Sequence, residues 1–268
     1  MMGSSAGIWR SISREEATTS RQSCACPKRP MSTSVNAELI RQLERARVLH
    51  EERAASPELA AALDRLALWQ SRRLNATYAD LARQPRYARA IAFFGTDLYG
   101  PGDFSRRDAD LARVVPHMTL VLPERVIGTI AGAMELSVLS HELDRALLGK
   151  LPSSAALSVA TYCAAYRALA NRPARERQIG LIVEVGAALD RYVASPLVRS
   201  ALMAMRYPAR LAGLGALQDL LERGFGAFWH MRGADEFLAT IKEREAALME
   251  AIFSGERAPF PEPDSAVA

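Results

Sequence analysis

The chain has 268 residues, 49% of them hydrophobic and 24% charged, which is the balance of an ordinary globular protein large enough to bury a core. This composition excludes a disordered chain, a collagen and a coiled-coil rod. Alanine and leucine together make up close to a third of the residues, which favours helix over strand. The net charge of +4, taken alone, points to a polyanionic partner.

Most of the positive charge lies at the start of the chain. Residues 1–30 carry a net charge of +3, which leaves +1 for the other 238 residues. This segment is rich in serine and arginine and ends just before a second methionine, Met31. We expect residues 1–33 to be a disordered leader: an over-extended gene start, a natural tail or an organelle transit peptide. The rest of the chain has no basic stripe, so no nucleic-acid partner is expected.

Apolar runs and cysteines exclude further classes of protein. The longest uncharged stretch, residues 151–166, contains Pro152 and is shorter than the roughly 20 apolar residues of a membrane helix. Two of the three cysteines, Cys24 and Cys26, lie in the leader, so a disulfide framework is not available. We therefore predict a soluble, cytoplasmic protein with no membrane partner, no metal and no cofactor.

Helix signals recur along the chain, whereas hairpin turns and alternating strand patterns do not occur. The caps, prolines and glycines predict helices over 36–54, from Pro57, over 78–84 and over 85–99. A helix from Ser105 is expected to break or kink near Pro116, and a long helix follows over 124–149. Further helices are expected from Ser153, from Pro173, from Pro196, from Pro208 to Met231, and from Gly233 to Ser254. We predict an all-α fold, a single compact domain of about nine or ten helices over residues 34–255. Residues 256–268 are expected to form a disordered C-terminal tail.

Residues 93–108 concentrate aromatic side chains, turn formers and opposed charges. Ser105 and Asp108 fit a capping box at the start of a helix. Arg106 and Arg107 then lie at the positive end of the helix dipole, where a cation is unfavourable unless a partner offsets it. One interpretation is an ion network with the neighbouring aspartates, Asp97, Asp103 and Asp110. The other is that the arginines and the helix N-terminus hold an anionic ligand such as a carboxylate or phosphate.

The second interpretation defines a candidate ligand-binding site. Its residues are Tyr99, Asp103, Arg106, Arg107, Asp108 and Arg210. A separate group of glycines, Gly213, Gly224 and Gly226, is interpreted as allowing close helix packing. Its alternative is a ligand that rests on exposed backbone against an aromatic wall of Phe225, Phe228 and Trp229.

Three other motifs lack part of the pattern that their chemistry requires. Gly213-Leu214-Gly215 has no third glycine and no preceding strand, so it is not a dinucleotide loop. His141-Glu142 lacks the second histidine of a metalloprotease helix, and Glu135 and Glu142 are expected to form salt bridges. Glu184 lies among apolar residues; it needs a partner if it faces inward, but the helical spacing favours a solvated position.

Residues 93–108 also resemble the signature of the bacterial proteins named for a Phe-Phe-Leu-Glu-Glu-Leu-Tyr motif, an uncharacterised family. The resemblance extends through residues 208–225 and covers roughly residues 35–255. Gly95 and Thr96 depart from the family's Leu-Glu, and Asp97 replaces a glutamate. The resemblance implies a shared fold. It assigns no activity, and no catalytic residues can be transferred from it.

We predict a non-catalytic helical protein that acts through a protein partner or through self-association. Apolar helix faces are abundant, whereas convergent catalytic groups are absent from the sequence pattern. The alternative is a small-molecule-binding protein or enzyme that takes an anionic compound in a pocket near residues 99–108.

Overall fold

Local capping signals explain where several helices begin. The computed structural model describes residues 34–98, 104–152 and 156–263, and within these ranges it contains helices and no strand. The Ser56 side chain accepts a hydrogen bond from the Leu59 amide, and Pro57 occupies the first helical position. Ser158 and Thr161 form a reciprocal capping box at a later helix. The prediction of an all-α domain is confirmed.

The described residues form eleven α-helices and one π-helical segment, Phe94–Leu98. The α-helices are α1 (Val35–Ala55), α2 (Pro57–Thr77), α3 (Ala79–Ala82), α4 (Pro85–Phe93), α5 (Ser105–Val121), α6 (Glu124–Leu148), α7 (Val159–Leu169), α8 (Arg172–Val193), α9 (Pro196–Leu211), α10 (Gly215–Met231) and α11 (Asp235–Phe253). None of them is long and apolar enough to cross a membrane.

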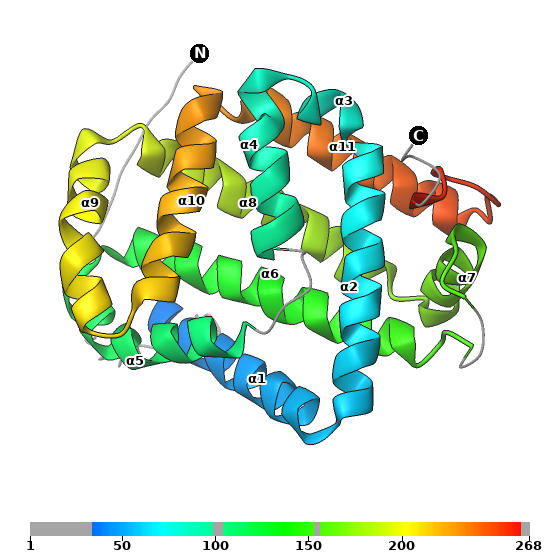
Figure 1. Ribbon diagram of the computed structural model, residues 1–268, viewed down its shortest axis with the longest axis horizontal. Helices are drawn as coiled ribbons and strands as arrows, with labels where there is room; N and C mark the ends of the chain where they lie inside the picture. The colour runs from blue at the N-terminus through cyan, green and yellow to red at the C-terminus, as the bar shows by residue number, and fades with distance from the viewer. Residues whose placement is uncertain (1–33, 99–103, 153–155, 264–268) are drawn as a thin grey trace, which may run out of the picture. The chain divides into compact units, whose positions relative to one another are not determined.

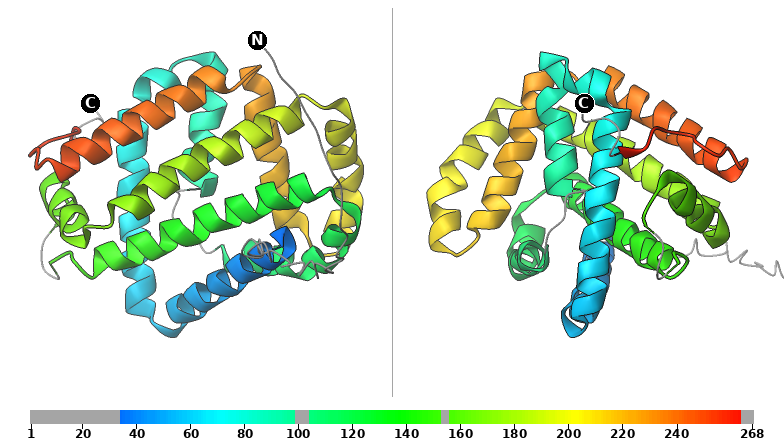
Figure 2. Two further views of the ribbon diagram at one scale, coloured as in Figure 1. Left: turned by 180° about the vertical axis from the view of Figure 1, so that it is seen from behind. Right: turned by 45° about the vertical axis from the view of Figure 1, so that its right-hand side comes forward.

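Within the unit that starts at Ser34, most helices belong to two crossing layers. One layer contains α1, α6, α8 and α11, which lie side by side in that order (Figure 2). The other contains α9, α10, α4 and α2, which run across the first layer (Figure 1). Apolar side chains from both layers fill the space between them, including Phe228 of α10 and Phe237 of α11, both buried. The candidate site described below lies between these layers.

Two prolines do not mark the helix boundaries that the sequence predicts for them. Helix α5 continues past Pro116 to Val121, so the expected break is absent; a proline removes only one backbone donor, and this one is exposed. Pro208 lies inside α9 and does not begin the next helix. The boundary is set instead by Gly213, whose φ of 74° is left-handed, and α10 begins at Gly215.

Two further expectations about segment ends differ from the structure. Ser153 lies outside the described residues, and the next helix begins only at Val159, after a non-helical stretch over 156–158. Within residues 256–263, where the sequence predicts a disordered tail, Phe260 and Pro263 are buried. Phe260 is buried against Trp69 and Tyr162, because it completes an aromatic cluster between α2 and α7.

Candidate functional site

A large cavity lies between the two helix layers. It has a volume of about 380 Å³, and α1, α2, α5, α6, α8 and α10 contribute to its wall. Most of the lining is apolar, with side chains such as Leu63, Ala67, Leu111, Met134, Leu220 and Phe225. We call this space the apolar cavity. Its size falls within the range of pockets that hold small organic molecules.

One side of the apolar cavity carries a small group of ionisable side chains. His50 Nε2 lies 2.9 Å from Asp108 Oδ2, and Arg107 Nε lies 2.8 Å from the other Asp108 oxygen. Burial alone would raise the pKa of Asp108, but the hydrogen bond from His50 and the charge of Arg107 hold it below its usual value. Asp108 is therefore an ionised acceptor, and His50 donates from Nε2. The Arg107 guanidinium also stacks on Phe104, 4.6 Å from the ring centroid.

His141 adds an uncharged imidazole to the same wall. Its ring centroid lies 6.2 Å from that of His50 and 6.2 Å from that of Phe104. Burial, together with the nearby His50, lowers the pKa of His141 to about 4. His141 is thus neutral at pH 7 and offers one donor and one acceptor without adding charge.

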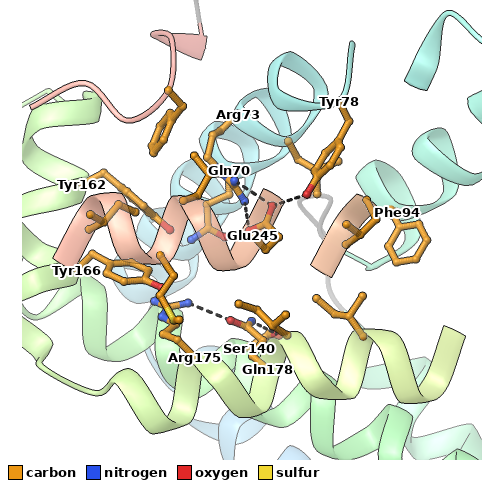
Figure 3. Close-up of a pocket in the computed structure, with 18 of the residues that line it drawn as sticks. Gln70, Arg73, Tyr78, Phe94, Ser140, Tyr162, Tyr166, Arg175, Gln178 and Glu245 are labelled. Carbon is orange, nitrogen blue, oxygen red and sulfur yellow. Dashed lines mark hydrogen bonds and ion pairs between the residues drawn. The ribbon is translucent and has the colours of Figure 1, made fainter. Parts of the chain in front are cut away.

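A second, smaller cavity shares lining residues with the first. Its wall combines apolar side chains with a larger share of polar and charged groups (Figure 3). It has a volume of about 90 Å³, and we call it the polar chamber. Arg73 of α2 forms an ion pair with Glu245 of α11 at 3.2 Å, and the Tyr78 hydroxyl donates to the same carboxylate at 2.8 Å. Burial and the charge of Glu245 raise the pKa of Tyr78, so the phenol keeps its proton.

Arg175, in the first turn of α8, supplies the least compensated charge of the polar chamber. The residue is only 6% exposed, and its Nη1 donates to Gln178 Oε1 at 3.2 Å. Its guanidinium lies over the Tyr166 ring, 4.4 Å from the centroid. Nε and Nη2 are buried and have no hydrogen-bond partner among the described residues. A buried guanidinium with two unmet donors is costly in free energy.

Three polar residues line both the apolar cavity and the polar chamber: Gln70, Ser140 and Asp144. Gln70 Nε2 donates to Asp144 Oδ1 at 2.8 Å, and Gln178 Nε2 donates to Ser140 Oγ at 2.8 Å. Burial raises the pKa of Asp144 to about 6, although Gln70 and Arg175 oppose the shift. The two spaces therefore adjoin at these three residues.

The sequence-predicted site residues fall into three groups. Arg107 lines the apolar cavity, and Asp108 is its ion-pair partner. Arg106 is exposed, and Arg210 forms an ion pair with Asp219 away from the cavity lining. Tyr99 and Asp103 lie outside the described residues.

The neighbouring aspartates pair with arginines other than those expected. Asp97 binds Arg223, at 2.6 Å, and Asp110 binds Arg113, at 3.2 Å. Asp108 contacts Arg107 and His50 of the distant helix α1. An ion network is present around residues 93–108, and its partners come from across the fold.

Sequence reasoning missed the residues of the polar chamber. Arg73, Asp144, Arg175 and Glu245 lie on four different helices, and each one resembles an ordinary charged surface position in its own segment. A signal was available for Arg175, because it occupies the first turn of a helix, where a cation is unfavourable.

The glutamates and the glycine discussed as alternative motifs have structural roles. Glu184 is a solvated side chain, 62% exposed, that pairs with Arg177, and Glu135 and Glu142 form salt bridges with Arg177 and Arg45. A Cβ at Gly224 would lie 3.0 Å from the Phe93 ring, so this glycine does allow a close approach. Across the described residues, no group of three or more histidine, cysteine or carboxylate side chains is arranged to hold a metal ion.

Comparison with known proteins identifies a family and no activity. A family model described as a domain of unknown function, DUF8198, matches residues 49–259. No curated protein and no solved structure is significantly similar to the chain. The matched residues include every lining residue of both cavities except Phe260. The chain belongs to the DUF8198 family of domains of unknown function.

Proposed function

We propose that the domain binds a small, mainly apolar molecule in the apolar cavity. The observation that carries this proposal is a space of about 380 Å³ whose lining is mostly leucine, isoleucine, phenylalanine and other apolar side chains from both helix layers. Transfer of an apolar molecule from water into such a space is favourable by roughly 25 cal/mol for each Å² of apolar surface removed from water.

The ionisable groups on the cavity wall support an orienting role toward a single polar substituent. The charge of Arg107 is already offset by Asp108, and His141 is neutral. The other arginines of the lining are also paired, Arg53 with Asp64 and Arg145 with Glu52. The wall therefore offers a few hydrogen-bonding atoms and little net charge, which suits a ligand body that is apolar with one polar group.

Filling the cavity from α2 is expected to abolish binding. In Ala67→Phe, the added ring would occupy space next to Leu63, and we expect the affinity for the neutral fluorescent probe N-phenylnaphthylamine to fall by at least about tenfold. The matched control is Ala61→Phe, an exposed position on the same helix outside the cavity lining. Equal probe affinity in wild type, Ala67→Phe and Ala61→Phe, measured by fluorescence titration, would contradict the proposal.

A second candidate function, self-association, is favoured by one surface. Nearly every residue of α9 is exposed, and its only buried residue is Ala209. Large apolar side chains are among the exposed ones, with Leu197 at 82%, Tyr207 at 71% and Leu211 at 71%. Several large apolar side chains exposed on one helix are typical of an interface, so we propose that two copies of the chain pair through α9.

This second proposal predicts a dimer whose mass depends on α9. We expect light scattering coupled to size exclusion to give a dimeric mass for the wild type and a monomeric mass for Leu197→Glu, because a buried carboxylate is unfavourable in an apolar interface. The matched control is Leu120→Glu, an equally exposed leucine on α5, 83% exposed. A monomeric wild type across the concentrations tested would rule out pairing through α9.

A further inference from the structure

We propose that the polar chamber binds a carboxylate group, held by the Nε–Nη2 edge of Arg175, and that the ligand of the apolar cavity is therefore an apolar monocarboxylic acid. The inference rests on the proposed function, because the same molecule would place its body in the apolar cavity and its head in the polar chamber. The two steps are nevertheless separable by experiment, since the first concerns the body of the ligand and the second its head.

The free edge of Arg175 is the first argument. Nη1 is used by Gln178 and the face of the guanidinium is covered by Tyr166, so Nε and Nη2 are the donors left over. Both atoms are buried in a side chain that lines the polar chamber, and Figure 3 shows Arg175 beside Tyr166 and Gln178 at its wall. Two parallel N–H groups match the two oxygens of a carboxylate.

The protein itself uses this edge to bind carboxylates. Arg177 donates from Nε and Nη2 to the two oxygens of Glu135, both at 2.8 Å. Arg206 binds Glu222 through the same two nitrogens, at 2.8 and 2.5 Å. Arg175 presents the same pair of donors with no carboxylate on them. The missing partner is a group of the same chemistry.

The charges around the polar chamber favour a single negative charge. Arg73 is offset by its ion pair with Glu245, so it adds little net attraction. The Asp144 carboxyl also lines the chamber and would repel a dianion such as phosphate more strongly than a carboxylate. Arg175 forms no ion pair among the described residues, because Asp144 acts on it only through space, and a monoanion on its free edge would pair with it directly.

The arrangement of the two spaces links this head group to an apolar body. Gln70, Ser140 and Asp144 line both the polar chamber and the apolar cavity. A volume of about 90 Å³ is small for a whole ligand and adequate for a carboxylate. The adjoining cavity of about 380 Å³ has room for a hydrocarbon chain.

The test compares decanoic acid with decanol on the full-length protein by isothermal titration calorimetry. We expect decanoate to bind at least about tenfold more tightly than decanol, because only the acid forms charge-assisted hydrogen bonds with Arg175. Arg175→Gln should remove this preference while decanol binding persists. Arg177→Gln, two positions along the same helix and bonded at the surface to Glu135, is the matched control and should keep the preference.

The possible outcomes separate the two proposals. Equal affinity of wild type for decanoate and decanol, with probe binding intact, would overturn the carboxylate site and leave the apolar cavity as a binding site. No binding of the probe, the acid or the alcohol would overturn both proposals. If Arg175→Gln does not fold, carbon-13 NMR of carboxyl-labelled decanoate on wild type replaces it: a bound carboxyl pKa below that of free decanoate supports the site, and an unchanged pKa contradicts it.

Discussion

Replacement of Glu245 by alanine is expected to lower the free energy of unfolding by about 3 to 5 kcal/mol. Glu245 is the ion-pair partner of Arg73, whose side chain is only 14% exposed, and it accepts the Tyr78 hydroxyl. Burial alone would lower the pKa of Arg73, but the charge of Glu245 more than offsets this and raises it. Without the carboxylate, Arg73 keeps its charge in a partly desolvated site. Urea denaturation at neutral pH measures the loss.

Two variants decide whether the unpaired charge is the cause. Glu184→Ala removes a carboxylate that is 62% exposed and should cost no more than about 1 kcal/mol, because solvent screens its pair with Arg177. The double variant Arg73→Met with Glu245→Leu removes both charges of the buried pair and should be more stable than Glu245→Ala alone. A loss below 1 kcal/mol in Glu245→Ala, or a double variant less stable than the single one, would contradict a role for the ion pair.

The variant Asp144→Asn is expected to stabilise the protein by about 3 kcal/mol near pH 8 and to have little effect near pH 4. Burial raises the pKa of Asp144 from its ordinary value of 3.8 to about 6 in the folded protein. The folded state therefore binds this proton more tightly than the unfolded state does. Wild type loses stability as the pH rises between these two values, and the loss is complete above pH 6. Asparagine does not titrate and still accepts a hydrogen bond from Gln70.

Denaturation curves of wild type and Asp144→Asn at several pH values between 4 and 8 test this prediction. The stability difference should grow with pH and then level off above about pH 6. Ser140→Ala, which changes a neighbouring polar group that does not titrate, is the control and should shift stability by the same amount at every pH. A difference between wild type and Asp144→Asn that is constant with pH would show that Asp144 keeps an ordinary pKa.

The helical segments were largely predictable because their signals are local. A cap such as Ser56 acts on an amide three residues away, and Pro57 fixes its own φ angle. Both signals can therefore be recognised in a short window of sequence. The predictions that failed concern competition between neighbouring signals. Pro208 was read as a helix start, but it is tolerated near the end of an exposed helix, and the left-handed Gly213 sets the boundary.

Part of the candidate site could also be anticipated from the sequence. Arg107 and Asp108 are adjacent in the chain, and the cost of a cation at a helix N-terminus drew attention to them. Their third partner, His50, is 58 residues away and could not be found from spacing. Which of the two arginines faces inward was likewise decided by packing, since Arg107 lines the apolar cavity and Arg106 is exposed.

The sequence by itself therefore determined the helical fold class and most helix boundaries, because capping and periodicity act over a few residues. The tertiary structure alone decided that Arg73 meets Glu245, 172 residues away, and that Arg175 and Asp144 share one chamber. These residues look like ordinary surface charges in their own segments. They form a site only because the crossing layers of helices remove them from water together. Desolvation strengthens the electrostatic interactions of their charges and raises the free-energy cost of unmet hydrogen bonds.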